Sequence, residues 1–233
     1  MLPKKTMEEK IYPLQRELHD KYRDTSFGET VQYKDLELVV STGVFHPWND
    51  SRPLVDKYHI NPGDKVLDVC TGAGTIAIDA ALKGAGSVVA LDINPEAIRC
   101  AKENARRYGF ESVIDARVSD MFSALKPGEM YDVITMNPPF TKHSTSDFAE
   151  RTVWDEDLKV HRAFFKNVKK YLKKDGRVYI SQAEFGAVEE MKEMAIEAGF
   201  VVRQIGKYEA DEDRVFYAFE LTRNEATYAL ATT

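Results

Sequence analysis

The stretch "VLDVCTGAGT", residues 66 to 75, decides how the rest of the chain is interpreted. It starts as a short apolar run and then turns through Gly72 and Gly74. The following residues, 75–84, are rich in alanine and end at a glycine, which is typical of an α-helix. A buried strand that passes through glycines into a helix is the first half of a βαβ unit.

The alternation of strand and helix continues through the chain. Strands are expected at 65–70, 87–93, 112–120, 131–136 and 176–184, with helices at 94–109, 156–173 and 187–199. The last two strands are joined by "ADED" (210–213), which is too short for a helical crossover, so they should form an antiparallel hairpin. The pattern predicts an α/β fold with a doubly wound, mostly parallel seven-stranded sheet and an antiparallel last strand.

The first part of the chain follows a different pattern. Residues 7–23 are expected to form an amphipathic helix, and residues 30–40 alternate like a pair of strands. The apolar face of that helix would comprise Ile11, Leu14, Leu18 and Tyr22. We interpret residues 1–42 as an N-terminal extension or lid and residues 43–233 as the main domain.

Composition sets limits on function. The 233 residues suffice for one domain with a sizeable core, and no apolar run of about 18 residues predicts a membrane span. Two cysteines give no disulfide framework, which favours a reducing cytoplasm, and the histidines and cysteines lack metal-ligand spacing, so no metal is predicted. A net charge of −6 counts against a large RNA footprint, because basic residues supply most non-specific affinity for phosphates.

Carboxylates near the glycine turn indicate an adenosine-containing cofactor. Asp92, 20 residues after Gly72, ends the next strand, where it can accept hydrogen bonds from ribose hydroxyls. Asp68 suits a ligand with a cationic amino group, and Asp120 suits an adenine amino group. However, "GAGTIA" also fits the G-x-G-x-x-A fingerprint, so a nicotinamide-dependent oxidoreductase remains an alternative, as does a non-catalytic binding subunit.

A second unusual stretch is "VITMNPPF", residues 133–140. The side-chain oxygen of Asn137 and the carbonyl of Pro138 would accept hydrogen bonds from a planar amino or amide group. Pro138 and Pro139 would stiffen the turn, and the exposed ring of Phe140 would stack on the acceptor. We therefore treat Asn137, Pro138, Pro139 and Phe140 as the candidate catalytic residues.

In order, "LDVCTGAGTIAI", "ALDINPEAI", "SDMF" and "NPPF" resemble the motifs of class I S-adenosylmethionine-dependent methyltransferases. The chain is most similar to the small-methyltransferase-domain group, which includes release-factor glutamine methyltransferases and many RNA and DNA amino-methyltransferases. The resemblance covers about residues 44–223. It implies a Rossmann-like methyltransferase fold and methyl transfer to a planar amino or amide nitrogen. A nucleobase in RNA is the favoured acceptor, and a protein glutamine or a small molecule stays open.

The resemblance also implies which residues contact S-adenosylmethionine. In it the turn holds the methionine part, Asp92 holds the ribose, and Asp120 with Met121 flanks the adenine. The segment 43–56 resembles the region before the first strand in this group, and Phe45 and Pro47 are expected to close over the cofactor. The complete predicted set is Phe45, Asp68, Cys70, Gly72, Gly74, Asp92, Ile93, Asp120, Met121 and Asn137. Cys70 departs from the acidic residue or glycine that is common there.

The polar segment 141–157 directly follows the Asn-Pro-Pro-Phe motif and is expected to form part of the acceptor pocket, although a plain surface loop is equally consistent with it. The predicted acceptor contacts are Phe140, His143, Ser144 and Trp154. His161 lies on an apolar stripe and is interpreted as a core histidine. The five lysines within 166–174 are interpreted as a solvated face, with contact to nucleic acid left open.

Overall fold

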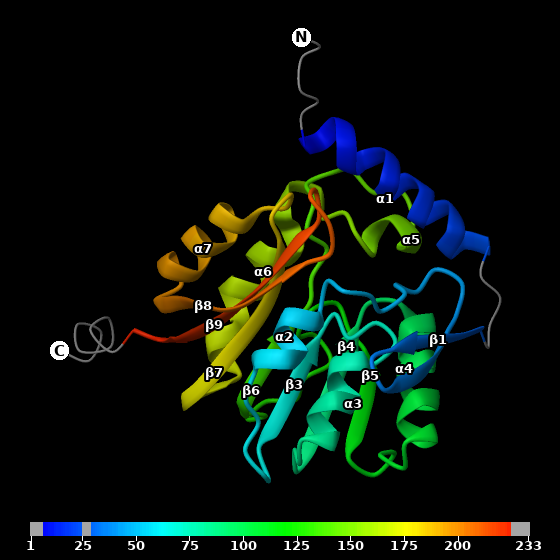
Figure 1. Cartoon of the computed structure of the whole chain (residues 1–233). Helices are drawn as coiled ribbons and strands as arrows, with labels where there is room; N and C mark the ends of the chain where they lie inside the picture. Colours follow the sequence, from blue (N-terminus) through cyan, green and yellow to red (C-terminus); the bar gives the residue numbers. More distant parts are fainter. Residues whose placement is uncertain (1–6, 25–28, 225–233) are drawn as a thin grey trace.

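The computed structural model describes residues 7–24 and 29–224, apart from the side chains of residues 7–9, 18, 19 and 21–24. A seven-stranded sheet runs through the molecule in the order β5-β4-β3-β6-β7-β9-β8 (Figure 1). Its strands are β3 (Lys65–Val69), β4 (Ser87–Asp92), β5 (Ile114–Val118), β6 (Tyr131–Met136), β7 (Leu172–Ala183), β8 (Phe200–Glu209) and β9 (Val215–Arg223). β9 is antiparallel to both β7 and β8, whereas β3 to β7 pair in parallel. The predicted fold, including the reversed last strand, is confirmed.

Helices cover both faces of the sheet. One face carries α2 (Arg52–Lys57), α3 (Thr75–Leu82) and α4 (Pro95–Arg107), and the other carries α6 (Lys159–Asn167) and α7 (Val188–Glu197). Successive strand residues point to opposite faces, so Val66 packs under the first set of helices and Leu67 under the second. Such strands are buried on both sides, which is why they appear in the sequence as continuous apolar runs.

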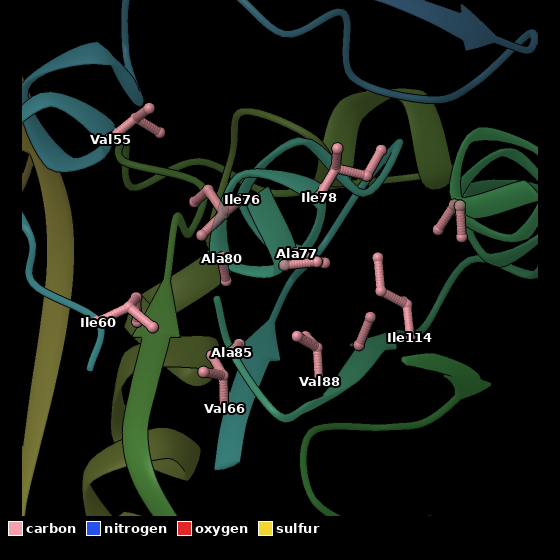
Figure 2. Close-up of a cluster of buried hydrophobic side chains, with 14 of the residues drawn as sticks. Val55, Ile60, Val66, Ile76, Ala77, Ile78, Ala80, Ala85, Val88 and Ile114 are labelled. Carbon is pink, nitrogen blue, oxygen red and sulfur yellow. The ribbon is translucent and has the colours of Figure 1, made fainter. Parts of the chain in front are cut away.

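The alanines of α3 allow that helix to lie close to the sheet. Figure 2 shows Ala77 and Ala80 on the side of α3 that faces Val66 and Val88, and all four side chains are fully buried. Larger side chains here would hold the helix further from the strands, because protein interiors are close-packed. This close approach fixes the N-terminus of α3 directly beyond the end of β3.

The helix predicted at 156–173 is shorter than expected. A 3-10 turn, η1 (Glu156–Leu158), precedes α6, and a second, η2 (Val168–Lys170), follows it. Asp157 and Leu158 have φ values of 52° and 55°, which interrupt a regular helix. β7 begins at Leu172 rather than near 176, because Leu172 pairs with Tyr131 of β6. The apolar residues of the predicted helix thus belong to more than one element, because those between Lys159 and Asn167 lie in α6 and Leu172 lies in β7.

The N-terminal segment packs against the main domain. β1 (Glu29–Tyr33) and β2 (Leu36–Val40) form the predicted antiparallel pair, and Asn104 of α4 donates to the Val39 carbonyl at 2.9 Å. α1 (Met7–Asp24) lies above the sheet next to the short helix α5 (Phe148–Arg151) (Figure 1). Ile11 is buried, but Leu14 is 44% exposed, so the expected apolar face is wrong at that position. The side chains of Leu18 and Tyr22 lie outside the described residues.

Two further expectations concern individual residues. His161 is fully buried between Asp155 and Gln182, which confirms the interpretation as a core histidine. In the lysine-rich segment, Lys170 and Lys174 are exposed to solvent. Among the helices of residues 7–24 and 29–224, none is long and apolar enough to cross a bilayer.

Candidate active site

A cavity of about 490 Å³ opens where the parallel strands β3, β4 and β6 end. In doubly wound sheets ligands bind at this carboxyl edge, and a cavity of this size suits a small molecule. Most of the predicted residues line it: Phe45, Cys70, Gly72, Asp92, Ile93, Asp120, Met121, Asn137, Pro138, Pro139, Phe140 and Trp154. Pro47 lines it as well. Asp68, Gly74, His143 and Ser144 are not part of its lining.

The turn after β3 needs glycine for two different reasons. Gly72 has a φ of 55° and borders open space, so its backbone faces the cavity without a side chain in between. Gly74 has a φ of 86° and begins α3. A Cβ at Gly74 would lie 3.1 Å from Ala101, so this glycine lets α3 and α4 pack closely. Gly74 therefore shapes the turn from behind the cavity and does not line it.

Asp92 ends β4 and is held by two backbone groups. Its two side-chain oxygens accept hydrogen bonds from the N–H groups of Gly72 and Asn94, each at 2.9 Å. A carboxylate has about four acceptor positions, so each oxygen can accept one more hydrogen bond. Burial raises the pKa of Asp92, which hydrogen bonds from the backbone N–H groups of Asn94, Gly72 and Ile93 partly offset. These acceptor positions fit a ligand with two adjacent hydroxyl donors, as on a ribose.

Asp68 occupies a different place from the one expected. Its side chain is fully buried, and its two oxygens accept hydrogen bonds from the hydroxyls of Thr71 and Thr135, both at 2.6 Å. Burial raises the pKa of this carboxyl to about 6. Contrary to the expectation that it lines the cofactor site, Asp68 lies beneath the turn and connects β3, β6 and the glycine loop.

The predicted adenine contacts Asp120 and Met121, which follow β5 (Ile114–Val118), do line the cavity. Asp120 is exposed, and the apolar side chain of Ile93 is 40% exposed. Ser119 organises this corner, because its hydroxyl donates to the Met121 carbonyl at 2.7 Å and accepts from the Ala124 N–H at 3.0 Å. An apolar surface beside a carboxylate fits a flat ring that carries an amino group.

Asn137 makes the most informative hydrogen bond of the site. Its Nδ2 donates to Oδ2 of Asp50 at 2.6 Å, whereas its Oδ1 is buried and has no partner among the residues that the structure describes. A buried acceptor without a donor is unfavourable by about 1–3 kcal/mol, so a ligand that donates a hydrogen bond to this oxygen would gain affinity from it. The oxygen predicted to receive an N–H of the acceptor is therefore the atom that the fold leaves unsatisfied.

Asp50 was not among the residues predicted from the sequence. It precedes α2, lines the cavity and is only 2% exposed, and its Oδ1 accepts from the Trp48 N–H at 3.2 Å. Burial raises the pKa of Asp50 to about 6, so the carboxylate form predominates at neutral pH. A carboxylate only accepts hydrogen bonds. Asp50 therefore orients the amide of Asn137 so that Nδ2 points toward Asp50 and Oδ1 is available to another donor.

Phe140 differs from the exposed ring that was expected. It is 6% exposed, and its ring centroid lies 6.3 Å from that of Phe216 on β9. The Phe140 carbonyl accepts from the Ala187 N–H at 3.1 Å. The residue lines the cavity, but its ring also anchors the Asn-Pro-Pro corner to the sheet. Stacking on an acceptor stays a prediction.

The segment after the motif forms one wall of the cavity, with a partly different set of residues from the predicted one. The ring of His143 contacts that of Trp154 in a tilted arrangement with centroids 4.2 Å apart, and Ser144 is exposed. Neither of these two lines the cavity, whereas Thr145, Phe148 and Arg151 from the same segment do. Within residues 7–24 and 29–224, no three His, Cys, Asp or Glu side chains are grouped as metal ligands would be.

Comparison with known proteins agrees with this site. The family model described as "Methyltransferase small domain" matches residues 35–210. A release factor glutamine methyltransferase from Koribacter versatilis is 36% identical over 150 residues, which are 59% of this chain and 52% of that protein. A release factor glutamine methyltransferase from Thermodesulfovibrio yellowstonii is 28% identical over 81% of this chain and 72% of its own length. The chain thus spans about half the length of the first of these relatives.

Solved structures show the same fold. A ribosomal protein L11 methylase from Lactobacillus delbrueckii superposes with a TM-score of 0.56 and 22% identity, over 72% of this chain and 74% of the methylase. The predictions of a methyltransferase and of S-adenosylmethionine as its cofactor are confirmed, and a nicotinamide-dependent oxidoreductase is not favoured. Because the family model matches more than half of its length, the chain belongs to the methyltransferase small domain family.

Proposed function

We propose that this protein transfers a methyl group from S-adenosylmethionine to the side-chain amide nitrogen of a glutamine in another protein. One observation carries the proposal: Asn137 lines the cavity, and its buried Oδ1 has no hydrogen-bond partner among the described residues. An amide NH₂ group supplies the donor that this oxygen lacks. The bound cofactor supplies a methyl group on a sulfonium that is already activated for transfer, so the protein has mainly to align the acceptor.

The Asn-Pro-Pro corner is suited to this alignment. The lone pair of an amide nitrogen is delocalised, which makes it a weak nucleophile. Asn137 Oδ1 and the Pro138 carbonyl would accept one hydrogen bond each from the NH₂ group, which orients the nitrogen and favours the positive charge that develops on it. Asp50 keeps the Asn137 amide from rotating, because the reversed amide would bring two oxygens together. The site is thus organised before the acceptor arrives.

A glutamine is favoured over a nucleobase for two reasons. The net charge of −6 opposes the binding of a polyanion, since phosphate contacts from Lys and Arg dominate affinity for nucleic acid. In addition, the two relatives named above are glutamine methyltransferases. The family resemblance had favoured a nucleobase in RNA. The Asn-Pro-Pro-Phe motif does not distinguish the two acceptors, because both present a planar nitrogen. We also propose a cytoplasmic location, which the free thiols of Cys70 and Cys100 support.

The test is transfer of a tritiated methyl group into the separated protein and RNA fractions of a bacterial lysate. We expect label in protein, released as volatile methylamine on acid hydrolysis, because the methyl group is on an amide nitrogen. Asn137→Ala serves as the matched control. Calorimetry should show that it still binds S-adenosylmethionine, whereas it should transfer no tritiated methyl group to the protein fraction. Label in RNA, or in protein but not volatile, would contradict a glutamine acceptor.

A further inference from the structure

The N-terminal helix contacts the acceptor side of the cavity through one buried polar residue. Gln15 of α1 is 5% exposed. Its Nε2 donates to the Thr141 hydroxyl at 2.8 Å, and its Oε1 accepts from the Trp154 Nε1 at 2.9 Å. Both partners belong to the segment that follows the Asn-Pro-Pro-Phe motif. A single side chain therefore satisfies one polar atom at each end of that segment.

These two partners form the neck of a closed lobe, residues 142–153. The Thr141 N–H donates to the Val153 carbonyl at 3.3 Å, and the Asp155 N–H donates to the Thr141 carbonyl at 2.8 Å. The chain enters the lobe after Thr141 and leaves it at Trp154, and these two residues are paired in a β-bridge. Gln15 spans this neck from outside, and Tyr12 adds a hydrogen bond to the Lys142 carbonyl at 3.1 Å.

The lobe also faces the cavity. Thr145, Phe148 and Arg151 line it from within the lobe, and Phe148 remains 42% exposed. The cofactor turn and Asp92 line it from β3 and β4, and Asn137 stands at the end of β6. The lobe therefore forms the wall that an acceptor group meets when it approaches Asn137.

We propose that Gln15 is a positioning residue for the methyl acceptor. By bonding both sides of the neck, it holds the lobe at the distance from Asn137 that the acceptor requires. This inference rests on the proposed function in one respect: it assumes that the methyl acceptor binds between the lobe and Asn137. α1 is accordingly part of the acceptor site, and its removal changes acceptor binding without changing the residues that face the cofactor.

The test compares Gln15→Leu with Gln15→Glu and with Leu14→Ala, an exposed neighbour on the same helix. Gln15→Leu removes the hydrogen bonds that Gln15 makes with the Thr141 hydroxyl and the Trp154 N–H. We expect its half-saturating concentration of the lysate protein fraction to rise about 10-fold, with the maximal rate changed about 2-fold or less. Gln15→Glu should return the half-saturating concentration toward the wild-type value, because a carboxylate accepts hydrogen bonds from both the Trp154 N–H and the Thr141 O–H.

Two acceptor-independent measurements accompany the transfer assay. In Gln15→Leu, the amide hydrogens of residues 141–155 should exchange faster, and the Kd for S-adenosylmethionine should stay within about 2-fold of wild type. Faster exchange with an unchanged half-saturating concentration would overturn the proposal, since Gln15 would then only stabilise the lobe. Equal losses of cofactor and acceptor binding would overturn it as well. If Gln15→Leu does not fold, Thr141→Val breaks the same contact from the other side.

This design separates the inference from the proposed function. If label enters RNA instead of protein, the glutamine proposal fails, and the same variants are compared with the RNA fraction as the acceptor. A rise in half-saturation in Gln15→Leu with rescue by Gln15→Glu would support the inference with either acceptor. No difference from Leu14→Ala would contradict it with either acceptor.

Discussion

Asn137 and Asp50 are 87 residues apart in the sequence, and their side chains meet at 2.6 Å beside the cavity. The bond leaves Oδ1 of Asn137 as a buried acceptor with no partner among the described residues. The carboxylate of Asp50 determines which end of the amide is left without a partner. The orientation of Asn137, on which methyl transfer to a planar nitrogen depends, thus follows from a contact outside the Asn-Pro-Pro-Phe motif.

Replacement of Asn137 by alanine should reduce methyl transfer and spare the cofactor. Loss of a preorganised acceptor in such a site lowers kcat by about 10²–10³-fold. Calorimetry with S-adenosylmethionine should show a Kd within about 2-fold of wild type, because Asp92 and the glycine turn remain intact. If calorimetry shows cofactor affinity falling as steeply as kcat, Asn137 holds the cofactor and not the acceptor.

The activity should depend on pH through Asp50. Burial raises the pKa of its carboxyl to about 6, so transfer should decline as the pH falls through about 6 and the carboxylate that orients Asn137 is protonated. Asp50→Asn should lower the plateau and remove this acid limb. Burial raises the pKa of Asp68 to about 6 too, so Asp68→Asn, assayed at saturating cofactor, is the control that should keep the limb. An unchanged acid limb in Asp50→Asn would show that another group titrates.

The same shift predicts how stability depends on pH. The folded-state pKa of Asp50 is raised above the value of about 3.9 expected in the unfolded chain. The native state therefore binds this proton more tightly, and the contribution of Asp50 to the free energy of unfolding should decrease as the pH rises from about 4 to about 6. Urea unfolding across this range should show that the free energy of unfolding of Asp50→Asn increases relative to that of wild type as the pH rises. An identical pH dependence in the two proteins would mean that Asp50 is not perturbed in the folded protein.

Much of the fold could be predicted because it depends on local patterns. Buried strands, a glycine turn and an Asn-Pro helix start are each encoded within a few residues, and Asn94 indeed caps α4 by accepting from the Glu96 N–H. The role of Asp50 could not be predicted, since nothing near it in the sequence indicates its partner. Gln15 was missed for the same reason: a polar residue in a helix suggests a solvent-facing side, and only tertiary contacts show that it is buried.

Asp92 should control cofactor affinity. Asp92→Ala removes the two oxygens that accept from Gly72 and Asn94 and that face the cavity. The Kd for S-adenosylmethionine should rise about 10–100-fold, which is typical for loss of charged hydrogen bonds. Isothermal calorimetry measures this directly, and Asp120→Ala tests the adenine end in the same way. If Asp92→Ala leaves the Kd for S-adenosylmethionine unchanged, Asp92 does not bind the ribose.

Gly74 should be needed for stability. Gly74→Ala places a Cβ 3.1 Å from Ala101 at a residue with a φ of 86°. Gly128→Ala is a matched control, because Gly128 has a φ of 85° and no atom within 4 Å of an added Cβ. Gly74→Ala should lower the free energy of unfolding by about 1–3 kcal/mol more than Gly128→Ala, since overpacking adds to the same backbone strain. Equal losses would show that Ala101 moves aside without penalty.

The account is tested most directly by a crystal structure of this protein with S-adenosylmethionine bound. It predicts that the sulfonium methyl points toward Oδ1 of Asn137 and the carbonyl of Pro138. An acceptor nitrogen should then fit between them, about 3–3.5 Å from the methyl carbon. A methyl group directed away from Asn137, or in contact with it so that no acceptor fits, would contradict the assignment of this corner as the site of transfer.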